Sequence, residues 1–283
     1  MEAQRLKAIV DGIRTLEPWP PVAFKLMELS RREDVLPSEL AAVVATDGAL
    51  TARVLRLCNS AHYGFQREVT SLHEAGVRLG SRALVGLVLT TCVERSFTAS
   101  PRRNDARGRR LWEHSLMGAL AAGFLAATSG LVDRHEAYTG ALLQDIGQLV
   151  ILTACEDLED EVRAQRQVGA SRREAERAVY GLDHAQIGAR LARRWQLPPS
   201  LVEVIEHHHE PEAATLEPRL VSICHLAEAV TRAVARGEGL GELAYELSGR
   251  ALGLAGLSPT KLADLEDALL AQLGRARDLV RAA

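Results

Sequence analysis

The sequence contains few aromatic residues and very few lysines. Phe, Trp and Tyr make up 4% of the 283 residues, so Leu, Ala and Val must supply most of the core, and that mixture favours helices over sheets. Of the 34 basic residues, lysine supplies those at positions 7, 25 and 261. The net charge is -3 and the isoelectric point is near 6.3. This balance excludes a strongly basic chain, and we expect no nucleic-acid partner.

Two further absences concern the cellular compartment. Cys58, Cys92, Cys155 and Cys224 form no C-x-x-C pair, which excludes a zinc knuckle and a dithiol redox motif and indicates buried, reduced thiols. The longest apolar run, at about residues 83–93, is shorter than the ~20 residues of a membrane span. The amino terminus lacks the apolar run of a signal peptide. We expect a cytoplasmic protein without membrane contact.

The sequence also lacks the alternation of β-strands, whereas helical periodicity recurs throughout. Two capping boxes, at Ser71 and Ser171, predict helix starts, and Asp183 is the expected N-cap of a later helix. One long helix is predicted over about residues 135–154, and the final helix over about residues 258–281. These patterns predict an all-α protein of a dozen or more short helices.

The clearest change in composition is the Arg-rich stretch over residues 100–110. We interpret it as a solvated linker, with contact to an anion or an acidic partner as the alternative. It separates a predicted amino-terminal helical part, residues 1–100, from a second helical part, residues 101–238. Glycine-rich breaks around residues 237–241 then lead into a carboxy-terminal helical extension, residues 239–283.

Several residues with metal-binding side chains lie on separate predicted helices: His114, Asp145, His184 and the run from His207 to His209. Imidazoles and carboxylates that converge within a helical bundle can hold a divalent metal with an open position for water. The alternative is that each histidine serves only the packing or the cap of its own helix. Three consecutive histidines on a helix point in three directions, so we expect at most two to face one site.

Longer motifs resemble a known family. The segment N-S-A-H-Y-G, Asn59 to Gly64, lies within a longer match from Arg53 to Gly80. It resembles the amino-terminal signature of the HDOD family, the HD-related output domain of bacterial signalling proteins. Further segments resemble other landmarks of the family in the expected order: residues 16–23, 111–115, 141–147, 181–184 and 208–211. The resemblance covers roughly residues 16–230. It implies an HD-like multi-helix domain preceded by a small amino-terminal helical subdomain.

The active relatives of that family, the HD and HD-GYP phosphohydrolases, imply which positions belong to a metal site. By this resemblance His114 is the first metal histidine and Asp145 is the aspartate of the His-Asp pair. His184, His208 and His209 match later ligands. The final acid falls on His225 or Glu228, depending on where a gap is placed.

The same resemblance reveals departures from the catalytic pattern. Gln144 stands in place of the paired histidine, and a neutral amide is a weak metal ligand. Gln148 occupies the place of the lysine that follows the His-Asp pair, and no D-G-x-G-Y-P loop follows His209. We therefore expect no catalytic residue, metal or cofactor, and a vestigial site at the positions His114, Gln144, Asp145, His184, His208, His209 and Glu228.

The resemblance implies a non-catalytic signal-transduction module that acts on other signalling proteins through protein–protein contacts. Two alternatives stay open: a divergent metal-dependent phosphohydrolase, and a sensor that binds a nucleotide second messenger without hydrolysing it. Asn59, Ser60, Tyr63 and Gly64 form a candidate interaction motif, with a purely structural role as the alternative. The sequence predicts neither the pathway nor the oligomeric state.

Overall fold

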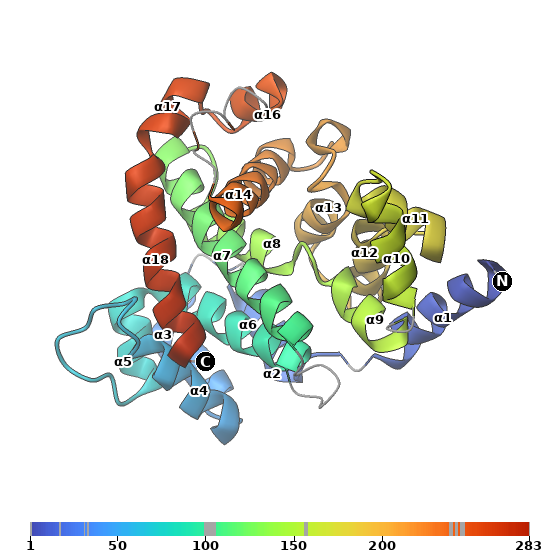
Figure 1. Cartoon of the computed structure of the whole chain (residues 1–283). Coiled ribbons are helices and arrows are strands. Elements are labelled where there is room, and N and C mark those ends of the chain that lie inside the picture. The colour runs from blue at the N-terminus through green and yellow to red at the C-terminus, as the bar shows by residue number, and fades with distance from the viewer. Residues whose placement is uncertain are drawn as a thin grey trace.

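The computed structural model describes residues 2–16, 18–30, 32, 34–98, 106–155, 158–237, 240, 243 and 247–282. Within these residues every regular element is a helix, which confirms the all-α prediction (Figure 1). The chain begins with α1 (Glu2–Thr15), α2 (Pro21–Leu29), α3 (Pro37–Val44), α4 (Gly48–Cys58), α5 (Leu72–Leu79) and α6 (Ser81–Thr98). Then follow α7 (Ala106–Ser129), α8 (Arg134–Leu143), α9 (Gly147–Ala154), α10 (Glu159–Gln167), α11 (Arg172–Tyr180), α12 (His184–Arg194), α13 (Pro199–His207), the 3-10 turn η2 (Pro211–Ala213) and α14 (Pro218–Arg236). The last are α16 (Gly249–Leu254), α17 (Pro259–Asp264) and α18 (Glu266–Ala282). No described helix is long and apolar enough to cross a membrane.

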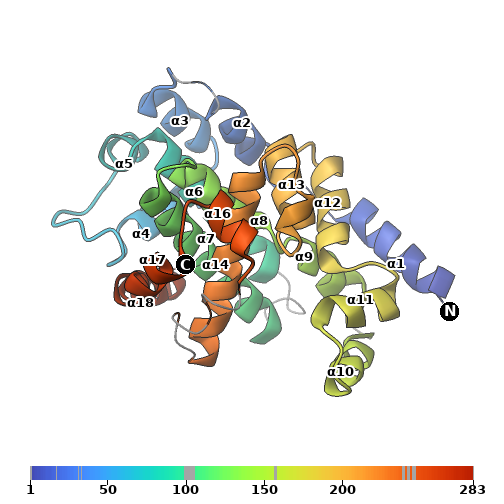
Figure 2. The ribbon, with the colours of Figure 1, turned by 90° about the horizontal axis from the view of Figure 1, so that it is seen from above.

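Two long helices organise the packing. α6 is buried along most of its length and is surrounded by α2, α3, α4 and α5 (Figure 2). α7 contacts α6, α8, α14 and α18. The buried face of α7 is rich in alanine and glycine, and small side chains let neighbouring helices approach closely. The four cysteines are buried and form no disulfide among the described residues, as the sequence predicts.

The first helix does not join the other amino-terminal helices. α1 packs against α9, α11 and α12, on the far side of the molecule from α3 and α5 (Figures 1 and 2). The Arg194 side chain on α12 donates hydrogen bonds to the carbonyl oxygens of Arg14, at 2.7 Å, and Leu16, at 3.0 Å. These carbonyls belong to the end of α1, where no intrahelical donor remains. The rings of Trp19 and Trp195 lie 5.3 Å apart beside this contact.

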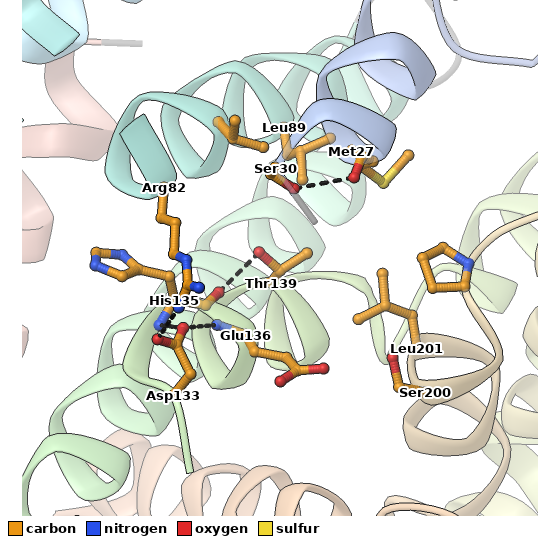
Figure 3. A pocket seen from close by; sticks show the side chains of 12 residues that line it. Met27, Ser30, Arg82, Leu89, Asp133, His135, Glu136, Thr139, Ser200 and Leu201 are labelled. Atoms are coloured by element: carbon orange, nitrogen blue, oxygen red, sulfur yellow. Dashed lines mark hydrogen bonds and ion pairs between the residues drawn. The ribbon is translucent and has the colours of Figure 1, made fainter. Parts of the chain in front are cut away.

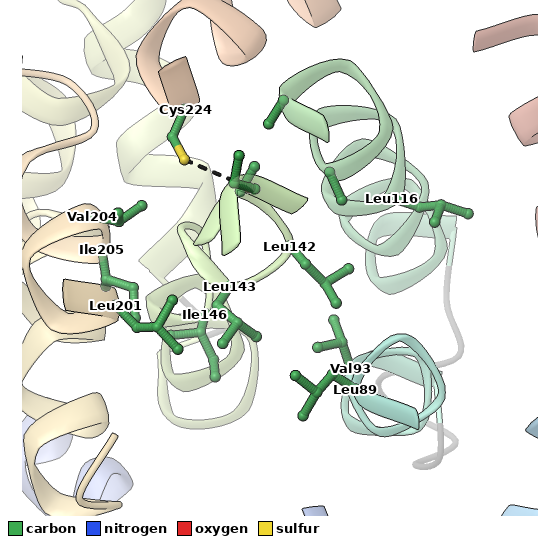
Figure 4. Packing of buried hydrophobic residues seen from close by; sticks show 14 of the residues in the cluster. Leu89, Val93, Leu116, Leu142, Leu143, Ile146, Leu201, Val204, Ile205 and Cys224 are labelled. Atoms are coloured by element: carbon green, nitrogen blue, oxygen red, sulfur yellow. Dashed lines mark hydrogen bonds between the residues drawn. The ribbon is translucent and has the colours of Figure 1, made fainter. Parts of the chain in front are cut away.

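The predicted single helix over residues 135–154 is wrong, because the chain forms two helices there. α8 ends at Leu143, α9 begins at Gly147, and a short turn joins them. The turn residues Gln144 and Ile146 keep helical dihedral angles, with φ and ψ of -54° and -35° and of -59° and -21°. The apolar pattern therefore passes through the break without a signal. Figure 4 shows Leu142 on the side of α8 that faces α6 and α7, with Ile146 on the side of α13.

Glycine explains why the second helix starts where it does. A Cβ atom at Gly147 would overlap the carbonyl oxygen of His184 and would lie 2.6 Å from the nitrogen of Gly188. The first turn of α9 therefore touches the backbone of α12 directly. This contact fixes the position of the turn before α9 relative to the start of α12.

Most predicted helix starts are confirmed. Ser171 and Asp183 each form a complete capping box, and Ser71 accepts a hydrogen bond from the nitrogen of Glu74. Ser258 caps α17 with Pro259 in the first position. The predicted final helix is interrupted at Leu265, which separates α17 from α18.

The predicted Arg-rich linker lies mostly outside the described residues, since the structure describes nothing from residue 99 to 105. Its last five residues belong to the first turns of α7. There Arg107 forms an ion pair with Glu159 at 2.8 Å. At least this arginine serves the fold.

Candidate functional site

Side chains from five elements converge in the middle of the helical assembly. They come from α7, from the turn between α8 and α9, from the start of α12, from the residues after α13, and from α14. The converging residues are His114, Gln144, Asp145, His184, His208, His209 and Glu228. His207 lies outside this group, so two of the three consecutive histidines face the site, as predicted.

The site has two sides with Asp145 between them. The Glu228 side consists of His114, Gln144 and Glu228, and the histidine side consists of His184, His208 and His209. One carboxylate oxygen of Asp145 lies 3.6 Å from Nε2 of His114, and the other lies 3.4 Å from Nε2 of His184. Asp145 therefore bridges the two sides.

Internal cations and an amide neutralise the Glu228 side. Oε2 of Glu228 accepts hydrogen bonds from Nε2 of Gln144 and from Nε2 of His114, both at 2.8 Å. Oε1 forms an ion pair with Arg232, one turn later on α14, at 2.6 Å. The carboxylate is buried, and its charge is balanced by donors of the protein itself.

Protonation follows from these contacts. The Glu228 carboxylate raises the pKa of His114 to about 9 against the effect of burial. Burial alone would raise the pKa of Glu228, but His114 and Arg232 hold it well below its usual value. At neutral pH the pair is therefore an imidazolium and a carboxylate.

The histidine side brings three imidazole rings close together. The Nε2 atoms of His184 and His209 lie 2.9 Å apart, and the rings of His208 and His209 have centroids 4.0 Å apart. Nε2 of His208 is buried without a hydrogen-bond partner among the described residues, as is Oδ2 of Asp145. Burial lowers the pKa of both His208 and His209, which favours neutral imidazoles there.

A second layer of polar groups orients these rings. Oε2 of Glu176 lies 2.5 Å from Nδ1 of His184, and Glu176 also accepts hydrogen bonds from Arg172 and Gln148. Burial would lower the pKa of His184, but Glu176 raises it. Nδ1 of His208 lies 3.0 Å from the carbonyl oxygen of Ile205, so the proton of that ring belongs on Nδ1 and Nε2 keeps its lone pair.

The two sides differ in their fit to a divalent metal ion. Imidazole nitrogens at ~2.1 Å from one ion lie about 3.0 to 3.4 Å from each other, close to the separation of His184 and His209. The carboxylate and carbonyl partners of the outer nitrogens are the arrangement found around metal-ligating histidines. The histidine side and Asp145 therefore fit one ion. On the other side His114, Asp145 and Glu228 also bring three ligand atoms together, but an ion there would have to displace the proton of His114 and compete with Arg232 for Glu228.

The chain matches the model of a known protein family. A family model described as the HDOD domain matches residues 16–211. The chain belongs to the HDOD family. A crystal structure of an HDOD domain protein of unknown function from Geobacter sulfurreducens has the same fold, with a TM-score of 0.82, 22% identity and coverage of 98% of each chain.

Two further relatives match most of this chain. The crystal structure of a candidate phosphohydrolase from Shewanella amazonensis SB2B is 27% identical, with a TM-score of 0.76 and coverage of 97% of each chain. An uncharacterized protein from Treponema pallidum (strain Nichols) is 28% identical over 260 residues, which is 89% of this chain and 48% of that protein. The chain thus spans about half the length of this curated relative.

The HDOD signature N-S-A-H-Y-G has a clear structural role. The side-chain amide of Asn59 donates to the carbonyl oxygen of Val69 at 2.9 Å and accepts from the nitrogen of Val69 at 2.8 Å. Gly64 has a φ of +60°, a conformation that favours glycine. Tyr63 packs between His62 and Phe65. These contacts fasten the turn after α4 to the segment before α5.

The sequence does not predict the residues that pair with the site histidines and with Glu228. Glu176 and Arg172 were not singled out, because a Glu and an Arg four residues apart on a helix usually form a surface pair. Arg232 follows Glu228 at the same spacing, which was a usable signal. The choice between His225 and Glu228 was left open. The structure places Glu228 in the site, whereas Nδ1 of His225 lies 2.8 Å from the carbonyl oxygen of His208.

Proposed function

We propose that this HDOD protein is a cytoplasmic, non-catalytic signal-transduction module that acts through contacts with other signalling proteins. The family membership supports a role in signalling, and buried cysteines that form no disulfide among the described residues fit a reducing compartment. The observation that carries the non-catalytic part is the state of Glu228. Its charge is balanced by His114 and Arg232 and it accepts a hydrogen bond from Gln144, where a phosphohydrolase would need a free ligand.

The physical reason is that two-metal phosphohydrolases use both ions to stabilise the attacking and leaving oxygens. Metal binding at the Glu228 side requires a deprotonated His114 and a carboxylate free of Arg232. Both requirements oppose existing ion pairs. The His114–Glu228 pair is largely buried, where breaking a charge pair is costly, whereas Arg232 is 46% exposed. We therefore expect at most one divalent ion in the site.

Hydrolysis and metal content test this part directly. We expect wild-type protein supplied with Mn²⁺ or Fe²⁺ to release no p-nitrophenol from bis(p-nitrophenyl) phosphate above the rate in buffer. We expect the double variant Gln144→His, Arg232→Gln to bind one more ion per chain than wild type. Turnover by wild type that disappears in Asp145→Ala would refute the proposal.

The partner contacts need a separate experiment. Affinity capture followed by mass spectrometry compares wild type with Tyr63→Ala, after circular dichroism has shown that both are folded. We expect a signalling protein that is retained by wild type and reduced by the substitution. If neither protein retains a partner, and deletion of the gene leaves signalling phenotypes unchanged, the interaction role fails.

A second candidate function is a metal-dependent phosphohydrolase that uses one ion. The specific observation in its favour is the geometry of the histidine side: Nε2 of His208 is buried without a hydrogen-bond partner among the described residues, and Oδ1 of Asp145 lies 3.4 Å from Nε2 of His184. A bound ion would supply Lewis-acid chemistry and a more acidic water. The name of the Shewanella relative gives the same activity as a candidate.

Metal analysis of protein purified without chelator shows whether an ion is bound, and a phosphodiester turnover assay on the same protein then distinguishes the enzyme from the signalling module. One equivalent of metal that is lost in His208→Ala and retained in His207→Ala would establish the ion. His207 is the matched control, because it is adjacent and lies outside the site. Metal together with phosphodiester turnover would favour the enzyme, and metal without turnover would favour the signalling module.

A further inference from the structure

A cavity lies away from the histidine cluster, between the N-S-A-H-Y-G turn and helices α6, α7, α8 and α18. Its volume is about 230 Å³, below the ~300 Å³ of sites that hold drug-sized ligands. An occupant is therefore limited to about one or two rings. Apolar and small residues form much of the wall, including Gly86, Leu87, Leu120 and Gly123.

Tyr138 provides an acceptor in this cavity. Its hydroxyl lies 2.6 Å from Oγ1 of Thr90, and Thr90 in turn donates to the carbonyl oxygen of Gly86 at 2.8 Å. A hydroxyl has one proton, so Thr90 must accept the hydrogen bond that Tyr138 donates. The Tyr138 oxygen then keeps a lone pair for another partner.

Tyr63 provides a donor on another side of the cavity. Its ring is held edge-on by His62, with centroids 4.9 Å apart, and lies parallel to Phe65 at 6.3 Å. Burial raises the pKa of Tyr63 well above its usual value, so the phenol keeps its proton at neutral pH. Its hydroxyl makes no hydrogen bond within the described part of the chain. The side chain is partly buried, so this hydroxyl is able to donate to a bound molecule.

Arg134 provides a positive charge beside these groups. It lines the cavity and is the first residue of α8, where a positive charge opposes the helix macrodipole. Its guanidinium forms no ion pair or hydrogen bond with the described residues. No lining residue of this cavity is acidic, so the local balance favours an anion.

The neighbouring cavity between the two halves of the protein has the opposite character. Figure 3 shows Arg82 directed toward Asp133, the N-cap of α8, and the ion pair between them measures 2.6 Å. Glu136 also lines that cavity. Its arginine is already paired and an acidic side chain remains, so that cavity does not select an anion.

We propose that the cavity beside Tyr63 binds a small aromatic anion. The ring of the ligand lies against Gly86, Leu120 and Gly123, and its carboxylate or phosphate pairs with Arg134 and accepts from the hydroxyl of Tyr63. Gln272 of α18 also lines the cavity, so the occupant contacts the carboxy-terminal helix. This site shares no residue with the histidine cluster, but it contains Tyr63, the residue that the partner-capture experiment substitutes.

Isothermal titration calorimetry of the full chain tests the proposal with three probes: 1-naphthyl phosphate, 1-naphthoate and neutral 1-naphthol. We expect at least one of the two anions to bind more tightly than 1-naphthol, and the preferred anion identifies the acidic group. Arg134→Gln should weaken that anion about tenfold or more, because it removes a charge-assisted contact. Ala127→Phe, at the exposed edge of the cavity, should abolish binding by filling the space.

Arg190→Gln is the matched control. Arg190 is exposed on α12, so this substitution removes the same charge far from the cavity lining. It should leave the affinity unchanged. No binding of either anion at millimolar concentration overturns the proposal. So does a loss in Arg190→Gln equal to that in Arg134→Gln, which would indicate only a general charge effect. Equal affinity for 1-naphthol would show an apolar cavity without anion selection and would also overturn it.

Discussion

Replacing Gly147 by alanine tests the contact that places the site residues. The added methyl group would overlap the carbonyl oxygen of His184 and would lie 2.6 Å from the nitrogen of Gly188. Both are backbone atoms, so no side-chain rotation relieves the clash and α9 must move away from α12. Overpacking of this kind costs ~1–3 kcal/mol, and we expect a value near the upper end, about 3 kcal/mol.

Thermal unfolding measures this cost. With an unfolding entropy of ~2.1 cal/mol/K per residue, a chain of 283 residues loses about 5 °C in Tm for ~3 kcal/mol. Gly274→Ala in α18 is the control, because nothing lies within 4 Å of its added Cβ and alanine is the better helix former. It should raise Tm by about 1 °C. A Gly147→Ala protein that melts within about 1 °C of wild type would refute the close approach of α9 and α12.

Three further predictions concern individual polar side chains. Glu176→Gln should cost ~3 kcal/mol at pH 7, because it breaks a buried charge pair. Although burial raises the pKa of Glu176, His184 and Arg172 lower it to about 2 from 4.5. The contribution of the Glu176 carboxylate to stability is therefore complete above pH 4.5 and is lost as the pH falls toward 2. Urea unfolding across that range should show the difference in unfolding free energy between wild type and Glu176→Gln shrinking. Asn59→Ala should cost ~1–3 kcal/mol of unfolding free energy, because it removes two hydrogen bonds to Val69. Ser60→Ala is the control: the buried hydroxyl of Ser60 has no hydrogen-bond partner in the described structure, so its removal should be near neutral in the same assay. Burial raises the pKa of Cys92 to about 12, so native protein at pH 8 should leave this thiol unmodified by a disulfide reagent until it unfolds, and rapid labelling of Cys92 would contradict the buried position.

The sequence predicts the helical class and the convergence of the site well, for identifiable reasons. Apolar periodicity and capping residues act locally, so Ser171 and Asp183 could be recognised without knowledge of the fold. The resemblance to HDOD proteins supplied the long-range information that placed His114, Asp145 and His184 together. The break after Leu143 was not predictable from periodicity, because the turn residues keep helical angles.

The electrostatic state of the site was beyond the sequence. That Gln144 directs its amide group to Glu228 depends on the relative placement of α8 and α14, which no local pattern contains. The same holds for Glu176, which reaches His184 from the preceding helix. Whether a carboxylate is free or neutralised therefore had to come from the three-dimensional contacts.

The position of α1 has a consequence for how the protein folds during synthesis. Its carbonyl oxygens are satisfied by Arg194, which lies 180 residues beyond Arg14 in the chain. At translation rates of ~5–20 residues per second, α1 leaves the ribosome about 9 to 36 s before this partner is made. α9 and α11 are made earlier and offer α1 a first docking surface. Attachment of the end of α1 to α12 through Arg194 is then a late event in folding.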